Sequence, residues 1–324
     1  MRKLRRIVLV TVAVIIAIPI LLLATTATYN FFATRSEASD ITSYGQLVPV
    51  DGKKMNVVTK GQGPETIVLL PGLGTAAPGL DYQPLIAELS TQYKVVAVEP
   101  FGTGLSDQTD AARSSATIVR EVHEALQYLG IERYVLMGHS IAGIYALTYA
   151  AEYPDELVAF VGIDSSVPGQ PGWDEPLPTK AIDIAHDVGL TRLITAIADD
   201  PYAGLPYDQQ TKEQMKLLSN KNSAAPTLLS EMEQAPTLLS EMEQAPTNFA
   251  SANGKTYPES LPVLLFVIAN DTDVPEWVDL HRQQATSVDT GQVIPLPGEH
   301  YLHHTLSPEI ARDTTAFLAS LPPR

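Results

Sequence analysis

The chain has 324 residues, 45% of them hydrophobic and 18% charged, so it can bury a sizeable core and is not disordered as a whole. Its 21 basic and 37 acidic residues give a formal net charge of −16, which disfavours nucleic acid as a partner because an acidic surface repels phosphates. Cysteine is absent, which excludes disulfides, thiol catalysis and cysteine-ligated metal centres.

The N-terminus has the composition of a membrane anchor. Basic residues dominate the first six positions, and residues 7–24 then form an apolar run without any charge. As a helix rising about 1.5 Å per residue, this run spans roughly 27 Å, close to the hydrocarbon thickness of a bilayer. We expect residues 1–27 to be an uncleaved transmembrane anchor, with the basic flank in the cytoplasm and the rest of the chain outside it. The alternative is a secretory signal, cleaved near Thr25-Thr26-Ala27 so that the remainder is secreted.

Residues 28–45 are polar and aperiodic, and we expect a tether there. Alternating strand and helix patterns follow. Segments 46–50 and 55–59 flank Asp51-Gly52 and predict a hairpin. Short apolar runs predict buried strands at 66–70, 94–98, 134–137 and 157–163, and helical spacing predicts helices at 81–90, 118–129 and 141–153. This alternation predicts an α/β fold, with a mostly parallel sheet and helices on both faces.

The alternation stops between residues 166 and 258, where prolines are frequent and pieces such as 179–198 have helical spacing. We expect an inserted helical lid there. It contains a perfect duplication, because APTLLSEMEQ at 225–234 recurs at 235–244. Two copies are too few for a solenoid, so we interpret them as a duplication tolerated on the surface. The pattern resumes with strands at 263–269 and 292–294 and helices at 276–286 and 308–321, so the predicted core comprises residues 46–165 and 259–324.

A serine stands between a predicted strand and a predicted helix, in Gly138-His139-Ser140-Ile141-Ala142. A tight strand-to-helix turn strains the backbone and requires small neighbours, and the helix that follows presents its positive end. The segment resembles the Gly-x-Ser-x-Gly nucleophile turn of the α/β-hydrolase superfamily, with Ala142 in place of the last glycine and Gly143 after it. The resemblance implies that Ser140 is the nucleophile. An ordinary turn serine is the alternative.

A nucleophilic serine needs a base to remove its proton. Residues 298–304 follow a predicted strand and precede the last helix, where the superfamily keeps its catalytic histidine. The resemblance assigns the base to His300 and a supporting position to His303. Clustered histidines can also chelate a metal, but the prolines and glycine of this segment predict a loop rather than a chelating helix face. We therefore expect neither a metal nor a cofactor.

The base in turn needs a carboxylate that orients it. In the superfamily this acid usually follows the strand after the lid, which implies Asp273. Asp271 lies two residues earlier and stays open as an alternative. Asp164 is a further alternative, because it ends the strand before the lid, a position that some members of the superfamily use.

Acyl transfer also requires donors for the oxyanion of the tetrahedral intermediate. One expected donor of this oxyanion hole is the backbone N–H of Ile141, directly after the nucleophile. The other is the N–H of Leu73, because residues 71–74 resemble the superfamily's His-Gly loop with proline in place of histidine. Residues 99–107 resemble its Asp-x-x-Gly-x-Gly-x-Ser loop, with Glu99 in place of aspartate, and we interpret them as structural.

Together these features predict a membrane-tethered serine hydrolase, similar to carboxylesterases and lipases. It would cleave a carboxylic ester, with an amide or a lactone as the alternative substrate class, through an acyl-enzyme. The leucines and methionines of the lid favour a small-molecule substrate with an apolar acyl part. A serine nucleophile argues against haloalkane dehalogenase and epoxide hydrolase chemistry, for which similar proteins use aspartate. The alternative from another class is a catalytically inactive binding or signalling module on the same fold.

Overall fold

The computed structural model describes residues 2–171, 177–234 and 248–322, and the chain divides into two compact units. Unit 1 consists of Met1–Thr42 and Pro178–Ala203. Unit 2 consists of Ser43–Leu177 and Gly204–Arg324. The stretch that we expected to form one lid, residues 166–258, is therefore shared between the two units.

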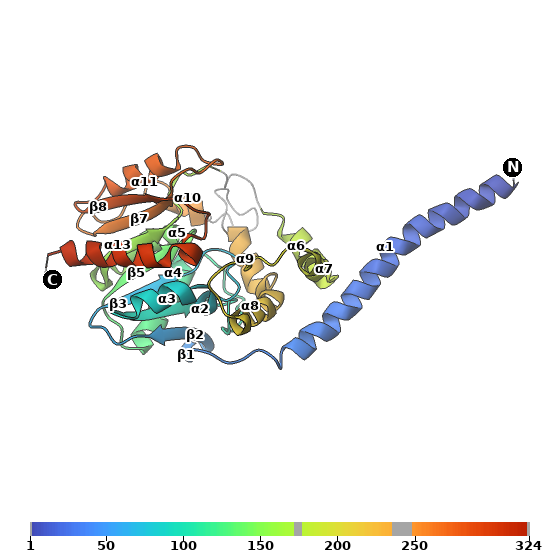
Figure 1. Ribbon diagram of the computed structural model, residues 1–324, viewed down its shortest axis with the longest axis horizontal. Helices are drawn as coiled ribbons and strands as arrows, with labels where there is room; N and C mark the ends of the chain where they lie inside the picture. The colour runs from blue at the N-terminus through green and yellow to red at the C-terminus, as the bar shows by residue number, and fades with distance from the viewer. Residues whose placement is uncertain (1, 172–176, 235–247, 323–324) are drawn as a thin grey trace. The chain divides into compact units, whose positions relative to one another are not determined.

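Unit 2 is built on an eight-stranded sheet with the strand order β1-β2-β4-β3-β5-β6-β7-β8 (Figure 1). Strands β1 and β2 form antiparallel pairs, and all pairs from β4 to β8 are parallel. The predicted, mostly parallel architecture is thereby confirmed. The strands are β1 (Gln46–Val50), β2 (Lys53–Lys60), β3 (Thr66–Leu70), β4 (Lys94–Glu99), β5 (Tyr134–His139), β6 (Leu157–Ile163), β7 (Val263–Ile268) and β8 (Gly291–Leu296).

The β1–β2 hairpin turns at Asp51 and Gly52, whose φ angles are 48° and 75°. Two successive positive φ angles are what a two-residue type I′ turn requires, and its twist matches that of the flanking strands. The Asp-Gly pair therefore predicted this turn correctly.

Helices cover both faces of the sheet because the central strands are buried on both sides. One apolar core contains residues of α4 (Ser115–Tyr128), α5 (Ala142–Glu152), α10 (Asn248–Ala252) and α11 (Trp277–Ala285). The other core contains residues of α3 (Gln83–Leu89), α12 (Leu302–Thr305) and α13 (Ser307–Ser320). The short helices α2 (Pro78–Asp81) and η1 (Pro154–Glu156) complete the connections.

Part of the inserted stretch packs on this core as α8 (Gln209–Asn222) and α9 (Pro226–Gln234). Helix α9 is the first copy of the duplicated decapeptide. Its Thr227 hydroxyl accepts a hydrogen bond from the N–H of Thr109 (2.8 Å) and donates to the carbonyl of the same residue (3.1 Å). The first copy is thus an integral part of unit 2, and the second copy, 235–244, lies outside the described residues.

Unit 1 contains α1 (Arg2–Glu37), α6 (Thr179–Asp187) and α7 (Leu190–Ile197). Among the described residues, α1 is the one helix long and apolar enough to cross a membrane. The tether predicted for residues 28–45 is wrong for its first ten positions, which continue α1 to Glu37. The polar residues there pack on α7, and such tertiary packing stabilises a helix that the apolar pattern alone does not predict.

The candidate site lies where several strands end. Ser140 follows β5 and Asp164 follows β6, its neighbour in the sheet, while His300 lies in the loop after β8. In an open parallel sheet, ligands bind outside the carboxyl ends of the strands, so this edge is the expected position of a reactive centre.

Candidate active site

Ser140 has a φ angle of 53°, in the left-handed region that residues other than glycine rarely adopt. The strain is possible because the strand and the helix around it approach closely. A Cβ atom on Gly138 would lie 2.9 Å from the Cβ of Ala142, and one on Gly143 would lie 2.3 Å from the carbonyl oxygen of Ser166. Gly143, one residue beyond the position of the motif's last glycine, therefore allows α5 to pack closely against residues 165–166. Ala142, which occupies the motif position itself, packs against Gly138.

The loop after β3 lies directly against this turn. A Cβ atom on Gly72 would lie 2.7 Å from Nδ1 of His139 and 3.0 Å from the Cβ of Ser140, so only glycine fits there. Leu73 follows it and is partly buried against the apolar core. Ile141 is buried at the N-terminus of α5. Ile141 directly follows the serine in the chain, and Leu73 follows Gly72, which lies against the serine. The two residues expected to donate N–H groups to an oxyanion are therefore both next to the Ser140 turn.

The partner of His300 is Asp164. Nδ1–H of His300 donates to Oδ2 of Asp164 at 2.7 Å. The other carboxylate oxygen accepts from the backbone N–H of Ile268 (3.0 Å) and the indole N–H of Trp277 (2.7 Å). Asp164 is 1% exposed and has a φ angle of 43°. These bonds fix the carboxylate and leave the imidazole with one defined orientation.

The loop that carries His300 is bonded to the residue that precedes the serine. Nε2–H of His139 donates to the carbonyl of His300 (3.0 Å), and the two ring centroids are 4.6 Å apart. His139 is buried, and burial lowers the pKa of this imidazole well below its usual value, so the ring is neutral. His139 therefore acts as a link between the two loops.

Asp273, which the sequence pattern favoured as the acid, is exposed and lies in a different local arrangement. Its backbone N–H donates to Oδ1 of Asp271 at 2.8 Å, and the N–H of Val274 donates to the same oxygen at 2.7 Å. Asp271 thus caps a turn. Of the three candidate acids, the structure brings Asp164 to the imidazole of His300. This corrects the expectation from the resemblance to the superfamily, which favoured Asp273. The sequence signal for Asp164 was its place at the end of the strand before the predicted lid.

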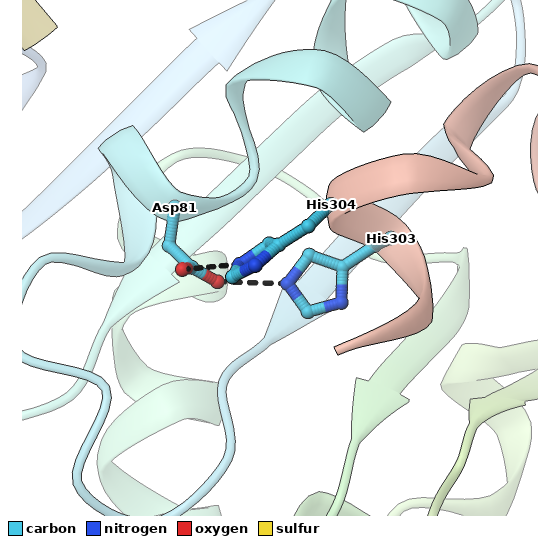
Figure 2. A group of neighbouring side chains, drawn as sticks. All are labelled: Asp81, His303 and His304. Atoms are coloured by element: carbon cyan, nitrogen blue, oxygen red, sulfur yellow. Dashed lines mark hydrogen bonds and ion pairs between the residues drawn. The ribbon is translucent and has the colours of Figure 1, made fainter. Parts of the chain in front are cut away.

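A carboxylate that sequence reasoning did not identify holds the two histidines that follow His300 in this loop. Figure 2 shows Asp81 facing His303 and His304, whose Nε2 atoms each lie 2.8 Å from one of its oxygens. Burial acts to raise the pKa of Asp81, but the hydrogen bonds from both rings outweigh it and hold that pKa below its usual range. Nothing in the sequence spacing indicates this pairing, because the residues are more than two hundred positions apart.

The same three residues, all with metal-ligating side chains, could in principle hold an ion. A ligating histidine almost always donates its other ring N–H to an acceptor. Nδ1 of His303, however, is buried without a partner in the described chain, as expected for an unprotonated nitrogen opposite a donating Nε2–H. Burial lowers the pKa of His303 and keeps its ring neutral. The cluster therefore fits a carboxylate that anchors the histidine loop better than it fits a metal centre.

Glu99 organises the neighbouring loop, as its structural interpretation requires. Its carboxylate accepts four hydrogen bonds of 2.7–2.9 Å, from Tyr44 Oη, Gly79 N, Asn56 Nδ2 and Leu105 N. Burial raises the pKa of this carboxyl despite these donors. A Cβ atom on Gly104 would lie 1.7 Å from Oε2 of Glu99, so the loop needs glycine at the point where it wraps the carboxylate.

Comparisons with known proteins agree on the fold. The sequence model of the alpha/beta hydrolase family matches residues 67–312. The uncharacterized protein YbdG of Bacillus subtilis strain 168 is 32% identical over 206 residues, which are 61% of this chain and 62% of that protein. The chain thus spans less than two thirds of the length of this curated relative.

Two solved structures illustrate the structural likeness. The enol-lactonase of Burkholderia xenovorans LB400 superposes with a TM-score of 0.60 and 17% identity over 85% of this chain and all of that one. A membrane phospholipase A described as a bacterial virulence factor has a TM-score of 0.59 and 18% identity over 97% of this chain and 98% of its own. At such identities the likeness is one of fold.

Proposed function

The chain belongs to the alpha/beta hydrolase family, and from that premise we propose that it is a serine hydrolase that cleaves a carboxylic ester through an acyl-enzyme. The observation that carries the proposal is the 2.7 Å hydrogen bond from His300 to Asp164. The loop that carries His300 is also hydrogen-bonded to His139, the residue directly before the strained Ser140. A nucleophile, a base and an orienting acid are the groups that acyl transfer requires.

In this mechanism Ser140 Oγ attacks the ester carbonyl while Nε2 of His300 takes its proton. Asp164 holds the Nδ1–H and stabilises the imidazolium that forms. The N–H groups of Ile141 and Leu73 stabilise the oxyanion, and the imidazolium then protonates the leaving alcohol. Water, deprotonated by His300, attacks the acyl-enzyme carbonyl and releases the acid and the free serine.

Asp164 therefore takes the role that the sequence pattern had favoured for Asp273. Its carboxylate accepts hydrogen bonds from His300, Trp277 and the backbone N–H of Ile268, and these three bonds keep the buried side chain in one rotamer. A solvent-exposed carboxylate such as Asp273 provides no comparable constraint on an imidazole.

An apolar acyl part of the substrate is proposed from the leucines and methionines of the inserted helices α8 and α9. A small cavity beside the oxyanion loop is lined by apolar and small residues together with the Tyr145–Glu231 pair, namely Leu70, Pro71, Gly72, Gly74, Pro100, Thr103, Ile118, Tyr145 and Glu231. Its volume of about 10 Å³ is close to that of a single water molecule, so this cavity does not itself accommodate an acyl chain. The structural neighbours include an enol-lactonase and a membrane phospholipase A.

We also propose that α1 anchors the enzyme in a membrane without cleavage, so that the catalytic unit lies outside the cytoplasm. Helix α1 continues unbroken through Thr25–Ala27, where a signal peptidase would cut, and its later residues pack on α6 and α7. The basic N-terminal flank supports this orientation by the positive-inside rule.

A fluorophosphonate probe tests the hydrolase proposal on the purified full chain in detergent. We expect covalent labelling of the wild type and none of Ser140→Ala, with both variants equally folded by circular dichroism. Labelling that survives in Ser140→Ala would place the nucleophile elsewhere. A folded wild type that resists both the probe and p-nitrophenyl esters of graded chain length would support the inactive binding module instead. Activity that is lost on chelation would contradict a metal-free mechanism.

A further inference from the structure

The C-terminal part of α1 packs on the α6–α7 pair through one stripe of polar residues, Thr26, Asn30, Thr34 and Glu37. The spacing of four, four and three places them on a single face of the helix. Thr26 Oγ1 donates to the carbonyl of Val188 at 2.6 Å, and Asn30 Nδ2 donates to that of His186 at 3.0 Å. The α6–α7 pair is therefore fixed to α1 at a defined height along its axis.

Arg192 of α7 closes this contact. Its guanidinium donates to Asn30 Oδ1 (3.0 Å), Glu37 Oε1 (2.6 Å) and Thr34 Oγ1 (3.3 Å). Gly189, between α6 and α7, has a φ angle of 72°, and a Cβ atom there would lie 2.4 Å from the carbonyl of Thr26. The close approach requires glycine, so this is a packed interface within unit 1.

The height of the contact coincides with the edge of the bilayer. If residues 7–24 fill the hydrocarbon, Thr26 and Asn30 lie about 3 and 9 Å beyond it at a rise of about 1.5 Å per residue, within the polar headgroup layer. The hydroxyls of Thr25 and Thr28 bond back to the carbonyls of Leu21 and Ala24, as suits apolar surroundings.

Aromatic residues on the remaining faces of α1 mark the same layer. Tyr29, Phe31 and Phe32 are exposed, and the guanidinium of Arg35 lies 3.4 Å from the centre of the Phe31 ring. Such aromatic belts with nearby basic residues are typical of the membrane–water boundary. The residues that hold α6–α7 and the residues that mark the boundary therefore occupy the same turns of α1.

Helix α7 presents an apolar face away from α1. Ile194 and Ile197 lie about 160° and 140° around the helix axis from Arg192. They are 53% and 79% exposed, and Ile184 of α6 is 63% exposed. The segment 179–197 has two basic and two acidic residues, so its attraction to a surface would come from apolar area rather than from net charge.

We propose that the α6–α7 pair is a lipid-binding surface, which inserts Ile184, Ile194 and Ile197 into the boundary layer of the bilayer that α1 spans. The occupant is the membrane because α6–α7 is bonded to the same turns of α1 that carry the aromatic boundary, and because the surface is electrically balanced. The inference rests on the proposed anchoring by α1, and goes beyond it by assigning a second membrane contact to a distant part of the sequence.

Because the chain lacks cysteine, single cysteines introduced at chosen positions can carry a nitroxide label without further substitution. Ile194→Cys and Ile197→Cys report the proposed surface, Ile15→Cys the middle of α1, and the exposed Tyr128→Cys of unit 2 serves as the aqueous control. The full chain is reconstituted in phosphatidylcholine vesicles, and each label is tested for collision with oxygen and with a water-soluble nickel chelate.

We expect the labels at 15, 194 and 197 to have an oxygen-to-nickel collision ratio several-fold above that at 128, with 15 the highest. Aqueous ratios at 194 and 197 beside a high ratio at 15 would overturn the lipid surface and leave the anchor intact. Labels at 194 and 197 shielded from both reagents would also overturn it, because they would be buried against protein, such as a second copy. An aqueous ratio at 15 would overturn the anchor and the surface together.

Discussion

At the scale of single residues, the candidate site is made of side chains that are each held by several partners. Ser140 and Asp164 both have positive φ angles at the ends of adjacent strands, so the backbone stores strain where the reactive groups emerge. The ring of His139 contacts those of His300 and His303, with centroid distances of 4.6 and 4.9 Å. The positions of Ser140, Asp164 and His300 thus depend on a few buried polar groups. We expect the replacement of any of these groups to lower activity or stability.

Replacing the acid distinguishes the two carboxylates that the sequence left open. Asp164→Asn would keep the shape but remove the charge and change the preferred imidazole tautomer, and kcat should fall by about 10³–10⁴-fold, as in other triads. Asp273→Asn changes an exposed side chain and should leave kcat within about twofold of wild type, since surface substitutions have small effects. Initial rates on a p-nitrophenyl ester, with saturation to separate kcat from KM, provide the measurement. A larger loss in Asp273→Asn would restore the first assignment.

The buried histidines predict the direction of the pH dependence of stability. Burial lowers the pKa of His139, His281 and His303, so they are neutral in the fold. Below about pH 6.5 the unfolded chain binds more protons at these positions than the folded one, and the free energy of unfolding decreases as the pH falls. The carboxyl of Asp81, whose pKa is lowered, adds a further loss only below about pH 4.

Urea unfolding of the detergent-solubilised chain checks this expectation. The midpoint should decrease between about pH 8 and about pH 5 while the m-value stays constant, which would show that the same transition is followed. A midpoint that rises over this interval would contradict the prediction, because it would mean that proton uptake by the folded chain, at buried carboxyls with raised pKa values such as Glu99, outweighs the uptake by the unfolded imidazoles.

At the scale of elements, the strand–turn–helix unit around Ser140 was predictable because its requirement is local. A glycine two residues before the serine, a small residue two after it and an apolar run on either side are all visible in the sequence. The acid was not predictable in the same way, because the three candidates differ only in which of them reaches His300. That depends on β6 lying between β5 and β7, and on Trp277 and Ile268 bonding to Asp164.

The closeness of the strand and helix predicts a compensating pair of substitutions. Gly138→Ala would bring two Cβ atoms to 2.9 Å and should destabilise the turn, lowering both the melting temperature and fluorophosphonate labelling. Ala142→Gly removes the second methyl group, so the double variant should recover part of both losses. Thermal melts and labelling rates of the two single variants and the double variant form the cycle. Equal losses in the single variant Gly138→Ala and the double variant would refute a direct clash.

At the scale of the whole molecule, the order of strands and helices in unit 2 followed from the sequence, whereas the division into units did not. Apolar periodicity identifies buried strands and amphipathic helices, and the match to the family over residues 67–312 confirms the architecture. The helical continuation of α1 to Glu37 depends on polar contacts with α6 and α7, which lie about 150 positions away. A hydropathy pattern contains no information on such pairings, and it therefore indicated a tether.

These contacts determine what should happen to the N-terminus. Cleavage after Ala27 would cut α1 within a continuous helix and separate Thr26 from Val188, which it contacts through a 2.6 Å hydrogen bond. We therefore expect the mature protein to resist alkaline extraction from membranes and to have the mass of the uncleaved chain. A variant lacking residues 2–24 should be extracted freely, because it lacks the apolar run. A mature N-terminus at residue 28 would show that the segment is a signal peptide, and the packing of α7 on the remaining Asn30, Thr34 and Glu37 would then have to persist without a span.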